Sequence, residues 1–355
     1  MLKETHQISF AEAINETTEQ LMSYDESIIC YGLGVNDPGR IFNTTKNLVE
    51  TFGDQRVFDM PTAENGMLGI GIGAAIAGLK PIIIFQRVDF FLLAMDQLVN
   101  NAAKWRFMFG GQSNVPITIR LIIGRGWGQG PTHSQSLQAW FAHIPGLKVV
   151  MPSTTEELKQ LLTASVLDPN PVIILEHRWL YQQKGNVPIQ IDNRWLLSEQ
   201  SNISTGDELT VVSSSYLTTE AKIALKFLQE HHGISIEHIT LSVLAPLNTS
   251  RIIESVEKTG RLLLLESAHE TCSISSSISH QVVASSFDKL KLAPVVMAKP
   301  DWPEPTTYSG TKYYYISAYD IAQKICEMLA ITLDIEALQK QGHHDVPGDW
   351  FTGPF

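Results

Sequence analysis

A single carboxylate opens the stretch of this sequence that is richest in chemistry. Glu64 follows Arg56–Asp59, which has the character of a short strand, and it precedes a glycine-rich segment that begins at Gly66. In doubly wound sheets, a strand end followed by the start of such a helix is a common place for an active site. Glu64 is therefore a candidate active-site residue. The alternative is a carboxylate that only favours the positive end of a helix dipole.

The glycines after Glu64 have a simpler explanation than phosphate binding. Gly69, Gly71 and Gly73 recur with alanines through residues 66–79, a segment predicted to be helical. Residues this small allow a helix to approach another backbone closely. We predict close helix packing here rather than a phosphate loop.

Alternating strands and helices must position this stretch. Short β-rich runs separated by helical segments indicate a mostly parallel, doubly wound α/β sheet. In the first half, the predicted strands are 27–32, 56–59, 81–85, 116–121, 147–152 and 171–176, and the predicted helices are 9–23, 66–79, 90–107 and 154–166. In the second half, the strands are 209–213, 235–239 and 261–266, and the helices are 219–231, 249–259, 273–286 and 318–329.

The 355 residues are enough for two such domains. A polar, irregular stretch between the two α/β series is the best candidate for a linker between the domains. We expect a first domain at 1–185, a linker at 186–206, a second domain at 207–330 and a C-terminal extension at 331–355 that contains His343 and His344.

The composition suits a folded, acidic protein. Hydrophobic residues make up 44% and charged residues 18%, and the net charge is −11. No general attraction to nucleic acid or to an anionic membrane is expected. Cys30, Cys272 and Cys326 are far apart, which favours a reducing cytoplasm over a disulfide framework or a zinc site. The apolar core of a signal peptide is missing from the first residues, and the apolar stretches are short for a membrane span.

From Asp59 onward the sequence resembles the β subunit of two-component 2-oxo acid dehydrogenase E1 enzymes, of the pyruvate and branched-chain type. The similarity covers most of residues 5–185, and the second half resembles a transketolase C-terminal domain more weakly. The matching positions are Asp59 to Gly66, Asp89-Phe90, Asp96-Gln97, Asn100, Ala102 to Lys104, Gly110-Gly111, Ile119-Arg120, Thr132 to Gln135, Ala139-Trp140, His143 to Val150 and Pro152-Ser153.

The resemblance implies thiamine diphosphate as the cofactor and a first domain that binds its pyrimidine. The family uses a glutamate at the position of Glu64 to bond the aminopyrimidine ring, which then removes the proton of the thiazolium. A carboxyl group in an apolar pocket can keep the raised pKa that this exchange needs. Ala63 and Phe90 match positions against the aminopyrimidine, and for Phe90 the alternative is ordinary core burial.

His133 matches the family histidine near the reacting centre, where it helps to bind the 2-oxo acid and assists transfer to a lipoyl group. The alternative is a buried histidine satisfied by hydrogen bonds. For Arg120, at a strand end, pairing with a buried carboxylate and a place near the active site are both open.

Metal sites are implied on this chain and on a partner. A structural potassium ion of the family falls on Ile117, Ser165, Asp168 and Asn170. The Gly-Asp-Gly…Asn motif that holds Mg²⁺ and diphosphate is missing, although Gly-Asp occurs at 53–54, 206–207 and 348–349. The resemblance thus implies a separate α subunit that supplies Mg²⁺, commonly in an α2β2 assembly, with a lipoyl-bearing E2 protein as a further partner.

Several segments depart from the family and leave the substrate open. Gly32-Leu33-Gly34-Val35 lacks the usual acidic residue, Ile122–Gly130 carries an arginine and a tryptophan, and Glu266–Glu270 replaces a glycine-rich turn. Three hypotheses are compared, and the changed loops at 122–130 and 266–270 motivate the second of them. The first is an E1 β subunit acting on a 2-oxo acid such as pyruvate, and the second is a split transketolase or carboligase that transfers a two-carbon or acyl unit to a sugar or aldehyde. The third, a non-enzymatic partner, is disfavoured because Glu64 and His133 are both present.

Overall fold

The chain forms two compact units in the computed structural model, which describes residues 4–125, 128–197, 201–339, 346 and 351. The first unit contains residues up to Gly124 together with Trp140–Leu197. The second contains Arg125–Ala139 together with the chain from Ser198 to Gly353. The sequence assigns the segment 125–139 to the first domain, whereas its contacts group it with the second unit.

A parallel sheet forms the centre of the first unit, in the strand order β6-β7-β5-β4-β2-β3. The strands are nearly continuous hydrophobic runs, as expected where both faces of a sheet are covered. Their bounds are β2 Ile28–Gly32, β3 Val57–Asp59, β4 Lys80–Phe85, β5 Thr118–Ile123, β6 Lys148–Val150 and β7 Val172–His177. All were predicted to within a few residues, which confirms the α/β fold class.

Two strands of the first unit lie outside the predicted set, as do β9 (Ser201–Ser204), β12 (Val243–Ala245) and β14 (Val295–Lys299) of the second. β1, Thr5–Ser9, pairs antiparallel with β8, Lys184–Pro188, so that Ser9 faces Lys184. β8 overlaps the start of the predicted linker. Polar, half-exposed residues in a two-stranded ribbon lack the apolar run by which a buried strand is recognised.

The helices of the first unit begin largely where the sequence places them. Ser9 caps α1 with a capping box, because its hydroxyl accepts from the Glu12 amide (3.2 Å) while the Glu12 carboxylate accepts from the Ser9 amide (2.8 Å). The helix bounds are α1 Phe10–Tyr24, α2 Leu48–Phe52, α3 Glu64–Ile76, α4 Val88–Phe91, α5 Ala103–Met108, α6 Gln138–Ala142, which spans the boundary of the units, and α7 Thr155–Leu167.

The helix predicted over 90–107 is interrupted. After α4 comes a 3₁₀ turn, η1 (Leu92–Ala94), then a π-helical stretch, η2 (Gln97–Ala102), before α5. Short η3 (Arg178–Leu180) follows β7. Wider π turns occur frequently at functional sites, and residue periodicity does not reveal them.

Close packing explains the glycines of α3. A Cβ atom on Gly71 would lie 2.5 Å from both Ile83 Cδ1 and the Tyr31 hydroxyl oxygen. The same hydroxyl donates a hydrogen bond to the Met67 carbonyl (2.9 Å), so helix and sheet touch here. A Cβ atom on Gly73 would meet nothing within 4 Å. Packing of α3 on the sheet, as predicted, is the role of Gly71.

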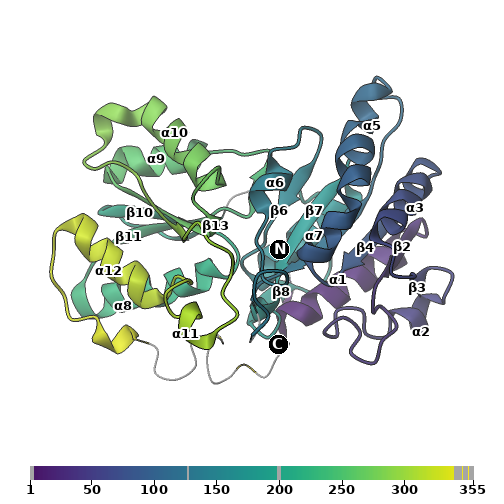
Figure 1. Cartoon of the computed structure of the whole chain (residues 1–355), viewed down its shortest axis with the longest axis horizontal. Helices are drawn as coiled ribbons and strands as arrows, with labels where there is room; N and C mark the ends of the chain where they lie inside the picture. Colours follow the sequence, from purple (N-terminus) through teal and green to yellow (C-terminus); the bar gives the residue numbers. More distant parts are fainter. Residues whose placement is uncertain (1–3, 126–127, 198–200, 340–345, 347–350, 352–355) are drawn as a thin grey trace. The chain divides into compact units, whose positions relative to one another are not determined.

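The second unit contains a sheet in the order β14-β13-β10-β11-β9, parallel except for the edge strand β9. Figure 1 shows α9 and α10 on one face of this sheet and α8 and α12 on the other. The five strands of this sheet are β9 Ser201–Ser204, β10 Leu209–Ser213, β11 Ile236–Thr240, β13 Leu262–His269 and β14 Val295–Lys299. The short strand β12, Val243–Ala245, also lies in this unit but is not part of this sheet. Its helical segments are α8 Leu217–His232, α9 Ser250–Thr259, α10 Ile274–Ser286, η4 Phe287–Lys289, α11 Tyr308–Thr311, α12 Ala318–Leu329 and η5 Glu336–Leu338.

One face of this sheet and the helices α8 and α12 enclose a hydrophobic core that Ile335 joins. Most of the predicted C-terminal extension, including His343 and His344, lies outside the described residues. Within the part of the chain that the structure describes, no helix is both long and apolar enough to cross a bilayer.

Two substitutions in α3 test the packing of its glycines. Gly71→Ala should destabilise the chain by about 1–3 kcal/mol, because the new methyl group overlaps Ile83 and Tyr31. Gly73→Ala is the matched control. It should stabilise the folded chain by about 0.5–1 kcal/mol, because alanine has less backbone freedom than glycine to lose on folding and its methyl group meets no neighbour. Urea unfolding followed by circular dichroism measures both. Equal midpoints for the two variants would contradict close packing at Gly71.

Candidate active site

Glu64 is a largely buried carboxylic acid at the start of a helix. It is the first residue of α3, its side chain is 7% exposed, and the preceding Ala63 provides no side-chain cap. None of the described residues forms a hydrogen bond or ion pair with its carboxylate. Its oxygens are not among the fully buried atoms that lack a hydrogen-bond partner, so the carboxylate keeps contact with solvent although most of the residue is covered. The position therefore suits a carboxyl group that meets a ligand rather than one that stabilises the fold.

Phe90 and Ala63 belong to the same unit as Glu64. Phe90 lies half-buried in α4, so it is not an ordinary core residue. The segments η1 and η2, which directly continue α4, pack against α3. Strand β4 and helix α3 thus bring both candidate cofactor residues to one part of the first unit.

His133 is carried by the second unit, unlike Glu64. It lies half-buried in an irregular segment, where its backbone amide donates to the Gly130 carbonyl (3.3 Å). A hydrogen bond joins its Nδ1 atom to the hydroxyl of Thr132 (3.0 Å). The ring is therefore oriented by its neighbour and is not part of a hydrophobic core.

Arg120 pairs with a buried carboxylate, which decides between the two alternatives for this residue. From β5 it donates to Glu176 on β7, with Nε 2.6 Å from Oε1 and Nη2 2.9 Å from Oε2, and both side chains are 0% exposed. Tyr181 donates its hydroxyl to Glu176 Oε2 (3.0 Å). Burial works to lower the pKa of Arg120, but the Glu176 carboxylate outweighs this and raises it. The pair is structural.

Arg87 is a charged residue that the sequence did not single out. It immediately precedes α4, is buried, and donates from Nη1 to the Gly124 carbonyl (3.4 Å). Burial lowers its pKa, and Asp89 and Tyr181 oppose that shift. The available signal was an arginine placed directly after a buried strand, three residues before Phe90.

The four residues assigned to potassium lie around the carboxyl end of α7 and the entry to β5. The Ser165 carbonyl accepts from the Asp168 amide (3.3 Å), and the Ile117 carbonyl accepts from the Val172 amide (2.9 Å). Asp168 Oδ1 accepts from the Asn170 amide and side chain (2.9 Å each), while Oδ2 pairs with Lys148. Carbonyl groups at the negative end of a helix dipole suit a monovalent cation, but the Asp168 carboxylate already has a cationic partner.

Across the described residues, no cluster of three or more His, Cys, Asp or Glu side chains is arranged to hold a metal ion.

Removing one charge of the buried pair tests its structural role. Glu176→Gln should destabilise the chain by about 3–5 kcal/mol, because it leaves the Arg120 charge buried without a counter-charge. The double variant Arg120→Met/Glu176→Leu should cost clearly less, since it removes both charges. Arg194→Met, at an exposed ion pair, is the control and should leave the urea midpoint unchanged. A midpoint for Glu176→Gln equal to that of the control would refute the assignment.

Two family models match this architecture. The transketolase pyrimidine-binding domain matches residues 6–184, and the transketolase C-terminal domain matches residues 200–321. A solved split-gene transketolase, described as an inactive β4 tetramer, superposes with a TM-score of 0.69 over 92% of this chain and 99% of the other. At 17% identity, this likeness shows the fold alone.

Curated relatives are closer in sequence. Pyruvate dehydrogenase E1 subunit β of Rhizobium meliloti is 38% identical over 83% of this chain, which spans 64% of that relative's length. The corresponding subunit of Rickettsia bellii is 35% identical over 90% of this chain and 99% of the relative. The β subunit of acetoin:2,6-dichlorophenolindophenol oxidoreductase from Cupriavidus necator is 36% identical over 89% of this chain and 95% of the relative.

The pyrimidine-binding model covers Glu64 and Phe90, and the C-terminal model covers most of the second unit. The alignments with the curated relatives extend over both parts of the chain. The chain belongs to the family of pyruvate dehydrogenase E1 β subunits and acetoin oxidoreductase β subunits, built from transketolase pyrimidine-binding and C-terminal domains.

Proposed function

We propose that this chain is the β-type subunit of a thiamine-diphosphate-dependent E1 enzyme that decarboxylates a 2-oxo acid such as pyruvate and passes the acyl group to a lipoyl acceptor. The observation that carries the proposal is the buried, unpartnered carboxylate of Glu64 among the described residues, in a chain of this family. Such a group fits the ring nitrogen of an aminopyrimidine, which offers the hydrogen-bond partner that the fold does not.

Thiamine diphosphate, when bound, supplies the nucleophilic carbon that attacks the oxo group. Glu64 would bond the aminopyrimidine ring and exchange a proton with it, and its burial strengthens that interaction. Phe90 would pack against the same ring, and Ala63 would leave room beside it. The organic chemistry belongs to the cofactor, whereas these residues orient it and hold the proton.

His133 would bind the 2-oxo acid and assist transfer of the acyl group. The bond between Thr132 and Nδ1 supports this role because it fixes the orientation of the ring. The positive charge of Arg87, buried three residues from Phe90, suits a substrate that carries a carboxylate.

A separate α subunit would complete the site. It would carry a Gly-Asp-Gly…Asn motif, which this sequence lacks, and would hold Mg²⁺ and the diphosphate. We expect an α2β2 assembly with a lipoyl-bearing E2 protein as the acceptor. The three free cysteines agree with the cytoplasm, the compartment predicted from the sequence.

Acetoin is a second candidate substrate. The acetoin oxidoreductase subunit resembles this chain as closely as the Rickettsia pyruvate dehydrogenase subunit does, 36% against 35% identity. The split transketolase shows the fold alone and gives no separate support to sugar transfer.

A potassium ion would be held by backbone carbonyls of Ile117, Ser165 and Asn170, with Asp168 nearby. The carboxyl end of α7 supplies the negative potential for such an ion. Lys148 already neutralises Asp168, so we expect binding through the carbonyl groups.

Replacing Glu64 in the complex with the α-type partner tests the central proposal. With thiamine diphosphate, Mg²⁺ and dichlorophenolindophenol as electron acceptor, Glu64→Gln should lower kcat by about 10²–10⁴-fold, because the amide cannot exchange the proton. Glu19→Gln, on the exposed face of α1, is the matched control and should retain full activity. Calorimetric binding of thiamine diphosphate to the variant complex gives a second measurement and should show weaker binding.

Comparing pyruvate, a branched 2-oxo acid and acetoin in the wild-type complex assigns the substrate. Full activity of Glu64→Gln, or no turnover with any of the three substrates, would overturn the proposal.

Salt exchange tests the potassium site. At constant ionic strength, replacing choline by K⁺ should raise the thermal midpoint of the chain, by the equivalent of about 2–3 kcal/mol at a hundredfold excess over Kd. Na⁺ should raise it less, because the carbonyl cage is fixed. Asp168→Asn should reduce the difference between the cations. Identical midpoints in choline, Na⁺ and K⁺ would argue against a bound potassium ion.

A further inference from the structure

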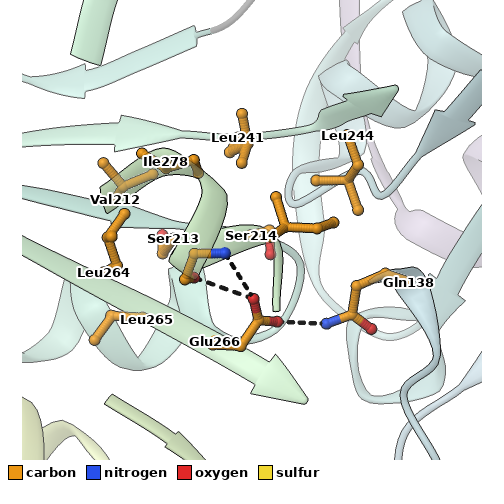
Figure 2. A pocket seen from close by; sticks show the side chains of 12 residues that line it. Gln138, Val212, Ser213, Ser214, Leu241, Leu244, Leu264, Leu265, Glu266 and Ile278 are labelled. Carbon is orange, nitrogen blue, oxygen red and sulfur yellow. Dashed lines mark hydrogen bonds between the residues drawn. The ribbon is translucent and has the colours of Figure 1, made fainter. Parts of the chain in front are cut away.

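The second unit contains a crevice at the place where doubly wound sheets usually bind ligands. Strand order reverses at β10, with β11 on one side of it and β13 on the other, and the carboxyl ends of these strands open onto the N-terminus of α10. The cavity there holds only about 10 Å³, room for about one water molecule. Ser213 and Ser214 of the β10 end, Glu266 of β13 and Ser275 of α10 line it, and Gln138 closes it (Figure 2).

Gln138 fills this crevice with a fully bonded amide. The side chain is 1% exposed, and its Nε2 donates to Glu266 Oε1 (2.6 Å) and to the hydroxyl of Ser267 (2.9 Å). Its Oε1 accepts from the hydroxyl of Ser136 (2.7 Å). Figure 2 shows the amide and the Glu266 carboxylate pointing toward one another. Both N–H groups of the amide thus have an acceptor, and its oxygen has a donor.

Glu266 anchors the other side of the contact. Its Oε2 accepts from the backbone amide (3.3 Å) and hydroxyl (3.1 Å) of Ser275 in the first turn of α10, and Oε1 also accepts from the Ala268 amide (3.3 Å). These bonds join the end of β13 to the first turn of α10. The charged side chain that acts on it is Lys299 of β14, whose closest carboxylate is Glu304 (3.0 Å).

The segment that carries His133 is held on the second unit at further points. The guanidinium of Arg125 lies over the ring of Tyr315, 3.7 Å from its centroid. At Gly130, where φ is +61°, a Cβ atom would lie 2.4 Å from the hydroxyl oxygen of Thr306, so the backbone touches that residue. Gln138 is the last of these contacts before the chain enters the first unit.

We propose that Gln138 and Glu266 are positioning residues for His133. The hydrogen bond between their side chains, called the anchor below, occupies the crevice at the switch point of the second unit, so that this crevice holds the segment 131–138 instead of a ligand. The inference rests on the proposed function for the role of His133, whereas the anchoring itself does not. Neither residue contacts reacting atoms. They act by limiting where the segment 131–138 and its histidine lie, and small displacements of a catalytic group cost large factors in rate.

Two substitutions at Gln138 separate positioning from mere stability. Gln138→Leu removes the bonds to Glu266 and should accelerate hydrogen exchange of the amides in 131–138 and lower kcat on the order of tenfold to a hundredfold at every pH. Gln138→Glu places a second carboxyl group beside Glu266, and such a pair shares one proton. Its kcat relative to wild type should therefore be near one at about pH 5.5 and fall on the order of tenfold by about pH 8.5.

Gln281→Leu is the matched control, since Gln281 on α10 also accepts from a hydroxyl, that of Thr249 (2.7 Å), but contacts no part of the segment 131–138. It should leave exchange and the pH profile unchanged. Both are measured on the complex with the α-type partner, with exchange also measured on the free chain.

If Gln138→Glu shows the wild-type pH profile and wild-type exchange, the anchor is wrong. If instead both Gln138 variants loosen 131–138 while His133→Ala keeps full activity, the anchor stands and the role of His133 in the proposed function fails.

Discussion

The buried ion pair of Arg120 and Glu176 is the constraint on which much of the first unit depends. It joins the neighbouring strands β5 and β7 with two charge-assisted hydrogen bonds and no access to water. Charges buried to this degree are tolerated only when paired in good geometry, so the register of the two strands is fixed by it. Beyond the pair, β5 ends at Ile123, and at the following Gly124 a Cβ atom would lie within 3 Å of the His177 ring at the end of β7. The chain toward His133 thus departs from a rigidly held strand end.

Glu64 contrasts with Glu176, because it is a largely buried carboxylic acid that lacks a partner among the described residues. Glu176 has its acceptors occupied by Arg120 and Tyr181, whereas Glu64 is nearly as well buried and meets no donor among the described residues. A carboxylate that no neighbouring group bonds can meet a ligand without first breaking a contact of the fold. The same fold supports α3 through the close approach at Gly71, so the unpartnered group is presented by a firmly packed helix.

Much of the architecture could be predicted because it follows from local patterns. Buried parallel strands such as β4 and β10 are largely apolar runs. Ser9 followed by Glu12 three residues later is the sequence signature of a capping box. The pattern was less informative for β1 and β8, which are polar and pair across the unit, and for η2, whose wider turn leaves no mark in periodicity. The predicted domain boundary placed 125–139 with the first domain by chain order, while its contacts with Glu266, Tyr315 and Thr306 place it in the second unit.

The sequence alone determined the family of the chain and singled out Glu64, Phe90 and His133 as candidate site residues, because residue type and spacing are local properties of the chain. Only the tertiary structure decided what each polar residue bonds to. It assigned Arg120 to Glu176, 56 residues away, and Gln138 to Glu266, 128 residues away. Hydrogen bonds between such distant segments depend on how strands and loops are arranged in space, and the local sequence pattern does not specify this arrangement.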